Sequence, residues 1–368
     1  MTTTAAPAAT RTRLHYLDNL RIVLTAMVVL HHVALTYGDI PVWFYTEPAK
    51  DSSGLVLDVL AGVDQTFFMG LFFLISGYFT PGSYDRKGRR PFLRGRLVRL
   101  GIPLLAFLLL LRPLVTIGGY VHARAERPGL PYPLYYITSW DPGPMWFAEV
   151  LLVFAVGYVL LRRLRPLAAV RSYVPGPRAV IGFTVALGVV TYAWRLAVPT
   201  TAYWPVVGLP SPAFLPQYVS MFVIGTLAFR RGWLDALTVR AGRLGLAAAG
   251  GGLLGYLAAI GASAVLGEIA ALLTAVFECV FAVGVIIALL VWFRTRFNRQ
   301  SLRARFLSDH AFTVYVIHPL VLVAVGSALR PIQLIAIGKF ALLAVLALPL
   351  CWALAYLVRS LPGAKRVL

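Results

Sequence analysis

The stretch NLRIVLTAMVVLHHVALTY, residues 19–37, is apolar over most of its length but carries Arg21, His31 and His32. Nineteen residues of α-helix rise about 28 Å, close to the roughly 30 Å of hydrocarbon in a bilayer. The residues that follow, Asp39 to Pro41, do not resemble the small-residue cleavage site of a signal peptide. We therefore expect a retained transmembrane helix.

Comparable apolar runs recur along the whole chain of 368 residues, of which 59% are hydrophobic and 13% are charged. The mean hydropathy of +0.78 lies outside the range of soluble domains. The sequence predicts an all-α, polytopic integral membrane helix bundle in the lipid bilayer of the cell membrane. Ten transmembrane helices are expected, near residues 19–37, 59–79, 98–119, 145–161, 179–198, 213–229, 244–263, 269–292, 311–329 and 337–357.

The formal net charge of +20 would suit a nucleic-acid-binding protein if the basic residues shared one surface. Instead they cluster in alternate loops, including 86–96, 162–178, 230–243 and 294–305. Basic loops lie on the cytoplasmic side of membrane proteins, so both termini are predicted to be cytoplasmic. We expect no nucleic-acid partner.

The same rule divides the Gly- and Ala-rich region 244–292 into two helices. A single crossing would place the basic loop after Arg294 outside, and small residues suit closely packed helices. Outside the membrane domain, predicted to span 14–360, we expect a disordered cytoplasmic tail over 1–13 and a short one over 361–368.

A polar stripe follows one face of the first helix. Arg21 and His32 are eleven residues apart, which returns to nearly the same helical face about 16 Å further along. Asp18 and Thr25 share that face. An ionisable residue at membrane depth is costly unless paired or solvated, so the alignment favours a functional role for His32. His31 lies about 100° around the helix, where a hydrogen-bonded packing role is expected.

The segment after the second helix is unusually basic and contains Arg94, Arg96 and Arg99. Such a segment serves topology and contacts anionic lipids. Its density also suits a phosphate-bearing cytosolic donor, because arginine binds phosphate in a bidentate manner. Just before it, Ser76 and Gly77 interrupt an aromatic run, where they either allow close helix approach or form part of a site.

Further polar residues fall inside other predicted helices. Glu149 lies about one turn below the outer surface beside Trp146, and His318 lies within the ninth helix. Arg195 and Glu278, on the fifth and eighth helices, are interpreted as members of structural ion pairs.

The outer loops 38–58 and 120–144 are rich in Trp and Tyr. Aromatic residues form belts at membrane interfaces, and they also stack on sugars. The loops therefore leave a carbohydrate-binding role open.

Several blocks, in this order, resemble the acyltransferase 3 family, membrane proteins that move acyl groups onto carbohydrates and related hydroxyl acceptors. The blocks are LHYLDNLRIVLTAMVVLHH (14–32), FFMGLFFLISGYF (67–79), RGRLVRLGIPLL (94–105), GPMWFAEVLLVF (143–154) and HAFTVYVIHPLVLV (310–323). The last block, with Tyr315 and His318, most resembles the branch that contains glucan biosynthesis protein C. The extracytoplasmic hydrolase-like domain of some family members is not expected here.

The resemblance implies roles for particular residues. The family's Arg and His, separated by ten residues, match Arg21 and His32, and its Ser-Gly motif matches Ser76 and Gly77. The family's Trp and Glu of the fourth helix match Trp146 and Glu149.

The resulting hypothesis is an enzyme of the acyltransferase class, working on acyl-CoA, with acetyl the default and succinyl open. Arg21, Ser76, Arg94, Arg96 and Arg99 would bind the donor. His32 would act as a general base or accept the acyl group, which imidazole chemistry permits.

Catalysis would also involve Arg21 and Glu149, and the acceptor pocket would include Trp146, Tyr315 and His318. Neither a metal nor a tightly bound cofactor is expected. Because Arg21 and His32 are separated along the helix, the donor must span them, so the site should be a tunnel.

Two other classes remain open. A proton-coupled transporter or flippase also needs charges on several transmembrane helices. It predicts inverted symmetry between the halves, but the stripe of the first helix has no counterpart in the sixth. A structural or sensory membrane protein would leave the spacing of Arg21 and His32 unexplained.

Overall fold

The computed structural model describes residues 14–40, 42–164, 173–204 and 208–368. Within these ranges ten helical spans are long and apolar enough to cross a membrane, and they form no β-strand. The predicted all-α architecture is thus confirmed, and each expected helix overlaps one span. The predicted tail over 1–13 lies outside the described residues.

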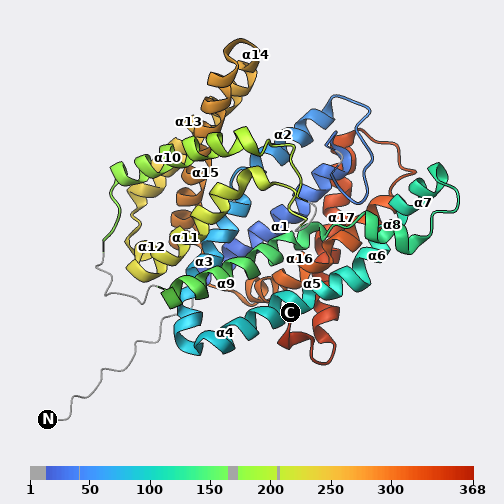
Figure 1. The fold of residues 1–368 in the computed structure, drawn as a ribbon, viewed down its shortest axis with the longest axis horizontal. Coiled ribbons are helices and arrows are strands. Elements are labelled where there is room, and N and C mark those ends of the chain that lie inside the picture. Colours follow the sequence, from blue (N-terminus) through green and yellow to red (C-terminus); the bar gives the residue numbers. More distant parts are fainter. Residues whose placement is uncertain (1–13, 41, 165–172, 205–207) are drawn as a thin grey trace.

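Figure 1 shows the arrangement of the α-helices. Several of the spans consist of more than one helical segment, including short π- and 3-10-helical turns. In chain order they are α1 (His15–Tyr37), α2 (Ser53–Gln65), α3 (Phe68–Lys87), α4 (Arg89–Arg96), η1 (Leu97–Gly101), α5 (Ile102–Ala106), η2 (Phe107–Leu111), α6 (Arg112–Val115), α7 (Ile117–Glu126), α8 (Tyr132–Thr138), η3 (Gly143–Met145), α9 (Trp146–Leu164), α10 (Pro177–Ala197), η4 (Pro212–Phe214), α11 (Leu215–Arg231), α12 (Trp233–Ala236), α13 (Val239–Gly261), α14 (Ser263–Leu266), α15 (Glu268–Arg296), α16 (Leu302–Ala328), α17 (Ala336–Ser360) and η5 (Ala364–Arg366).

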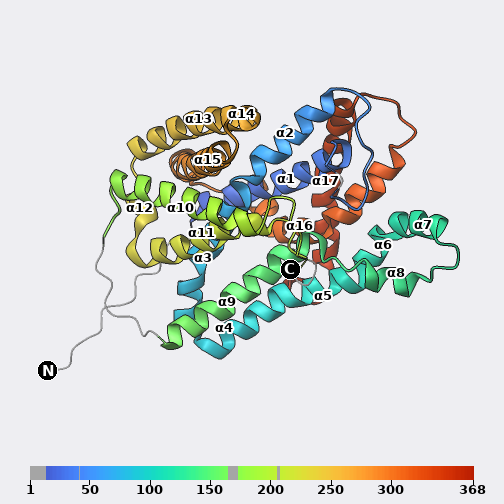
Figure 2. The same cartoon turned by 45° about the horizontal axis from the view of Figure 1, so that its top comes forward.

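The first helix, α1, packs against α2, α15, α16 and α17, and Figures 1 and 2 show it in the interior of the bundle. Asn19, near its start, donates hydrogen bonds to the carbonyls of Phe297 and Arg299, 2.7 and 2.9 Å away. We call this end of the bundle the basic end, because α3, α9, α11 and α15 finish there with arginine or lysine. The opposite end is called the far end.

The second span is broken near its middle, where a continuous helix over 59–79 was expected. Helix α2 ends at Gln65 and α3 begins at Phe68. The Thr66 carbonyl accepts a hydrogen bond of 2.6 Å from the Gln217 amide of α11. A broken helix at membrane depth needs such replacement partners, because lipid offers none. The expectation of an uninterrupted helix was therefore wrong.

The third span contains two π-helical turns, η1 and η2, each followed closely by a proline, Pro103 or Pro113. Proline lacks the N–H that an α-helical turn requires, and the wider turns accommodate this loss. The basic segment 86–96, expected to be a loop, is helical on both sides of Gly88, whose φ of 75° reverses the chain. The outer loops also contain helical structure in α2, α7 and α8.

Glycines set the closest contacts between helices. A Cβ atom on Gly77 would lie 2.2 Å from the Phe222 carbonyl oxygen of α11, and one on Gly225 would lie 2.1 Å from the Leu74 carbonyl oxygen of α3. Helices α13 and α15 also approach closely, since a Cβ atom on Gly245 would lie 2.8 Å from the Gly284 carbonyl oxygen. This confirms two closely packed helices within residues 244–292. It also confirms the close-approach role for Gly77.

At the far end, the loop before α2 caps the start of α17. Asp51 Oδ2 accepts from the Ala336 N–H and Ser53 Oγ accepts from the Ile337 N–H, each at 3.0 Å. The hydrogen bond from the Ser53 side chain, followed by those from backbone N–H groups, lowers the pKa of Asp51 below 3.8. A carboxylate at a helix N-terminus also interacts favourably with the helix dipole.

We expect Asp51→Asn to increase amide exchange at Ala336 and Ile337, because the charged cap is lost. A depressed pKa stabilises the folded state fully above the unfolded pKa of 3.8, and this contribution is lost progressively as the pH falls from there through the lower folded-state pKa. The wild-type protection should therefore decline below about pH 4. Hydrogen exchange with mass spectrometry measures both effects, with the exposed Glu126→Gln as control. Unchanged protection in Asp51→Asn would contradict the capping role.

Candidate active site

A cavity of about 1400 Å³ runs through the bundle and includes both Arg21 and His32 in its lining. Thr25, Val28 and Leu35 of α1 line it as well, at the spacing of one helical face. The stripe expected on the first helix thus faces a cavity. Its volume exceeds the roughly 300–1,000 Å³ of an ordinary ligand pocket.

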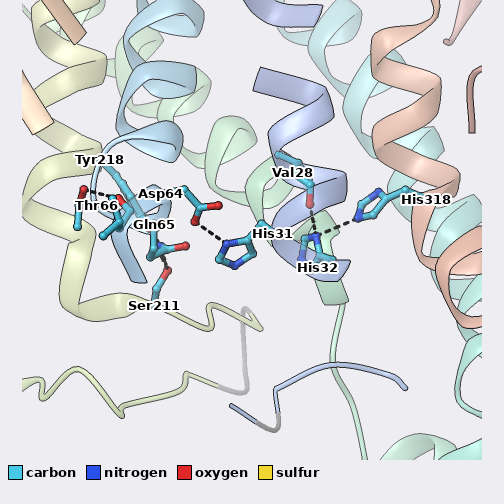
Figure 3. Close-up of polar contacts among 10 residues, drawn as sticks. Val28, His31, His32, Asp64, Gln65, Thr66, Ser211, Tyr218 and His318 are labelled. Atoms are coloured by element: carbon cyan, nitrogen blue, oxygen red, sulfur yellow. Dashed lines mark hydrogen bonds and ion pairs between the residues drawn. The ribbon is translucent and has the colours of Figure 1, made fainter. Parts of the chain in front are cut away.

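The hydrogen bonds of His32 determine which of its ring nitrogens holds a proton. His32 Nδ1 lies 2.8 Å from the Val28 carbonyl oxygen, and His318 Nδ1 lies 2.7 Å from the Tyr315 carbonyl oxygen. Carbonyls only accept, so both Nδ1 atoms carry hydrogen. In the neutral ring, His318 Nε2 is then an acceptor, 3.2 Å from His32 Nδ1. In this tautomer His32 Nε2 keeps its lone pair, as a base or nucleophile requires. Figure 3 shows the contacts of His32 with Val28 and His318.

His318 and Tyr315 take different positions around His32. His318 is fully buried and absent from the described residues that line the cavity, so it supports His32 from behind instead of forming the pocket. The Tyr315 ring does line the cavity, while its hydroxyl donates to the Pro144 carbonyl at 2.5 Å. Trp43 packs on the His32 ring with a centroid distance of 4.0 Å.

The neighbouring histidine, His31, is paired with a carboxylate. Its Nδ1 lies 2.7 Å from Asp64 Oδ1, and both side chains are buried. The His31 and His32 rings meet edge to face at a centroid distance of 5.3 Å, and His31 also lines the cavity. The expected packing histidine is therefore hydrogen-bonded, but it also borders the site.

The broken helix continues this polar series away from α1. Gln65, the last residue of α2, donates to the Tyr218 hydroxyl at 2.9 Å and to Ser211 Oγ at 3.4 Å. Figure 3 shows the polar side chains in sequence from Tyr218 through Asp64 and His31 to His318. Nothing in the local sequence indicates this arrangement, because the break at Thr66 contains neither glycine nor proline.

Basic side chains line the cavity at the basic end of the bundle, in a part that we call the basic arm. These are Arg21, Arg86, Lys87, Arg96 and Arg99. Arg96 Nη2 donates to Thr80 Oγ1 at 3.2 Å, and its guanidinium lies over the Phe92 ring. None of the described lining residues of this arm is acidic, and Asp18, whose Oδ1 lies 3.8 Å from Arg21 Nη1, offsets one of the five positive charges. The remaining positive charge suits an anionic group.

The position of Arg94 differs from the expectation. Its side chain is exposed and is absent from the described lining of the cavity. Residues two apart on a helix point about 200° apart, so Arg94 and Arg96 cannot share a face. Arg86 and Lys87, which were not selected as donor ligands, line the arm instead. Ser76 lines the cavity as well.

Trp146 and Glu149, both on α9, differ in their position relative to the cavity. Trp146 lines the cavity and stacks on Tyr218 at a centroid distance of 5.6 Å. Glu149 is absent from the described lining, although its Oε2 atom is buried without a hydrogen-bonding partner among the described residues. The structure therefore does not bring Glu149 into the cavity with His32.

A second part of the cavity, which we call the side arm, extends between α10, α13 and α15. It is lined by Arg195, Ser211, Tyr256, Thr274 and Glu278. Arg195 and Glu278 form two parallel hydrogen bonds of 2.8 Å, so the two intramembrane charges expected to belong to ion pairs are partners of each other.

Most of the chain matches a known protein family. The acyltransferase 3 profile, described as an acyltransferase domain, matches residues 14–356. The chain belongs to the acyltransferase 3 family. It is accordingly a multi-pass membrane protein with an acyltransferase domain. The transporter alternative has no support from this membership.

Individual relatives match a smaller part of this chain. Glucans biosynthesis protein C from Escherichia coli K12 is 32% identical over 158 residues, which is 42% of this chain and 40% of the relative. The proteins of the same name from the O1:K1 / APEC and O9:H4 (strain HS) groups match to the same extent. The matched segment thus covers less than half of each relative. No solved structure matches the chain.

Proposed function

We propose that this acyltransferase moves an acyl group from acyl-CoA to a carbohydrate hydroxyl, with His32 as the general base. The observation that carries the proposal is the cavity in which the basic arm and His32 occur together. An anionic donor bound by the basic arm can extend its thioester along the α1 face toward His32. Acetyl is proposed as the acyl group, and succinyl fits the same chemistry.

In the proposed step, His32 Nε2 takes the proton of the acceptor hydroxyl while the hydroxyl oxygen attacks the thioester carbonyl carbon. The new C–O bond forms and the C–S bond breaks, which releases CoA as a thiolate. The His32 imidazolium returns its proton to that thiolate. No other reactant is needed, and the imidazole is regenerated.

The orientation of the protein follows from the donor. Acyl-CoA is a cytosolic metabolite, so the basic arm and both termini are proposed to face the cytoplasm, as the distribution of basic residues predicts. The far end, with the side arm and the Trp43 loop, then faces the opposite side. We propose the cell membrane as the location.

Removing charge from the basic arm should weaken donor binding. We expect Arg96→Gln together with Arg99→Gln to raise KM for acetyl-CoA about 10–100-fold, since each lost charge-assisted hydrogen bond costs roughly 1.5–3 kcal/mol before solvent screening. The KM for the carbohydrate should not change. Two-substrate kinetics on purified protein measure both constants.

Arg94→Gln is the matched control, because Arg94 lies on α4 with Arg96 but outside the described cavity lining. It should leave KM for acetyl-CoA near the wild-type value. An equal rise in both variants would show that the basic end acts only through its overall charge.

The His31–Asp64 pair is proposed to support charge changes at His32. When His32 becomes an imidazolium, the Asp64 carboxylate lies one imidazole away and offsets the positive charge. Asp64→Asn keeps the size of the side chain and an oxygen acceptor, but removes this charge. We expect kcat to fall about 10–100-fold, as is typical for a group that supports a reactive side chain from outside the first contact layer.

The control for this variant is Asp58→Asn on the same helix, where Asp58 accepts a hydrogen bond of 3.0 Å from the Asp39 N–H at the far end. Initial rates at saturating substrates give kcat for both variants. Full activity of Asp64→Asn would exclude a contribution of its charge to the reaction.

A further inference from the structure

We propose that the side arm is the acceptor-binding site, and that the Arg195–Glu278 pair holds hydroxyl groups of an uncharged carbohydrate there. This inference rests on the proposed function, since it assigns the place of the second substrate. The ordinary reading is an ion pair that only joins α10 to α15. Three observations favour a role of the pair in binding carbohydrate. These are the charge balance of the cavity, the unused hydrogen-bonding atoms of the pair and its position.

Charge divides the cavity into two chemically different parts. The basic arm is cationic, whereas the Arg195 charge in the side arm is offset by the directly bonded Glu278. An anionic donor gains electrostatic stabilisation from the basic arm and none from the side arm. A neutral polar ligand is what the side arm can bind without leaving a charge uncompensated.

The ion pair also has hydrogen-bonding capacity left over. Arg195 uses Nη1 and Nη2 for the two Glu278 oxygens, while its buried Nε–H has no partner among the described residues. Each Glu278 oxygen keeps a further lone pair. Neighbouring hydroxyl groups of a sugar match this set, because one can accept from Nε–H while the next donates to the carboxylate.

Packing holds the pair in place before any ligand binds. The Arg195 guanidinium lies 4.8 Å above the Phe214 ring, and Glu278 is buried in α15. The Tyr256 ring and the Thr274 and Ser211 hydroxyl groups complete the arm. A fixed polar group beside an aromatic wall is a typical arrangement for orienting a small polar ligand.

The side arm is continuous with the histidines. Ser211, in its lining, accepts from Gln65, and Gln65 directly follows the Asp64 that pairs with His31. Figure 3 shows this connection. A carbohydrate chain that is bound at Arg195 and Glu278 can therefore present its terminal hydroxyl to His32 Nε2, while the donor approaches from the basic arm.

Cysteine protection tests the assignment without requiring turnover. Thr274→Cys places a thiol in the side arm and Ser83→Cys places one in the basic arm; both positions line the cavity and are partly exposed. The native Cys279 and Cys351 are fully buried, so they should not react. The rate of modification by a small neutral methanethiosulfonate reagent is measured on purified protein with CoA alone or with a neutral glucose oligosaccharide alone.

We expect the oligosaccharide to slow modification of Thr274→Cys about tenfold at roughly ten times its dissociation constant, because only ligand-free protein reacts. It should not protect Ser83→Cys, which CoA should protect. The inference would be overturned if CoA protected Thr274→Cys, or if the oligosaccharide did not protect it. If the oligosaccharide protects Thr274→Cys but CoA does not protect Ser83→Cys, the inference stands and the proposed donor site fails.

A second set of variants tests the ion pair itself. Arg195→Leu together with Glu278→Leu removes both charges at once, which avoids leaving one buried and unpaired. In the Thr274→Cys background, oligosaccharide protection should disappear, while CoA should still protect Ser83→Cys in the same double-leucine background.

The matched control is Lys339→Leu together with Glu47→Leu, an ion pair outside the described cavity lining. It should keep both kinds of protection. Retained oligosaccharide protection in the Arg195 and Glu278 variant would show that the pair serves packing alone.

Discussion

Replacing His32 by glutamine should lower kcat by about 10²–10⁴-fold, the range that a positioned general base contributes. Glutamine is close to histidine in size and retains hydrogen-bonding groups, but its amide cannot take up the acceptor proton. The donor contacts lie in the basic arm, so binding of CoA should be unchanged. Initial rates of acyl transfer and equilibrium CoA binding on the same purified sample separate these effects.

The control for His32 is another histidine with the same local bonding. His310 on α16 holds its Nδ1 2.6 Å from the Phe306 carbonyl oxygen, one helical turn back, as His32 does with Val28. It is absent from the described cavity lining. His310→Gln should therefore retain transfer, and a loss of activity equal to that of His32→Gln would indicate a general effect on folding.

Adding one methyl group at Gly77 should disrupt the packing of α3 on α11. The new Cβ atom would lie 2.2 Å from the Phe222 carbonyl oxygen, and a backbone atom cannot move aside as a side chain can. Alanine improves helix propensity by about 1 kcal/mol, yet the overpacking costs about 1–3 kcal/mol or more. We expect Gly77→Ala to lower the melting temperature and the yield of monodisperse protein.

Gly157→Ala on α9 provides the comparison, because a Cβ atom there would meet no heavy atom of the described neighbouring residues within 4 Å. It should leave thermal stability unchanged or slightly higher. Thermal unfolding in detergent, monitored by size-exclusion chromatography, distinguishes the two variants. Equal stability of Gly77→Ala and Gly157→Ala would contradict the close approach of α3 and α11.

The features that sequence reasoning predicted depend on local periodicity. Apolar runs of about membrane length give the ten spans, and 3.6-residue spacing places Arg21, Thr25 and His32 on one face of α1. Both follow from single helices, so no knowledge of neighbours is needed. Arg21 and His32 share one face of α1, and that face lines the cavity.

Features that depend on tertiary contacts were not predictable. The break between α2 and α3 has no glycine or proline to mark it, and the Gln217 side chain of a distant helix satisfies the freed carbonyl. This break accompanies the contact of Asp64 with His31. The sequence placed both residues in the membrane, but their distance of 33 positions gave no reason to pair them.

The rotation of α4 about its axis after the turn at Gly88 was likewise not predictable from the sequence. The reversal at Gly88 sets which side of α4 faces the cavity, and it turns Arg96 inward and Arg94 outward. Charge density alone treated the two arginines as equivalent. The partnership of Arg195 with Glu278 also required the packing of α10 on α15.

The most direct test of the proposed reaction is transfer of label from radiolabelled acetyl-CoA to a neutral glucose oligosaccharide by the purified protein. We predict that label enters the oligosaccharide with wild-type protein and with His310→Gln. With His32→Gln it should remain on CoA, although CoA still binds. Transfer by His32→Gln at the wild-type rate would contradict the assignment of His32 as the base.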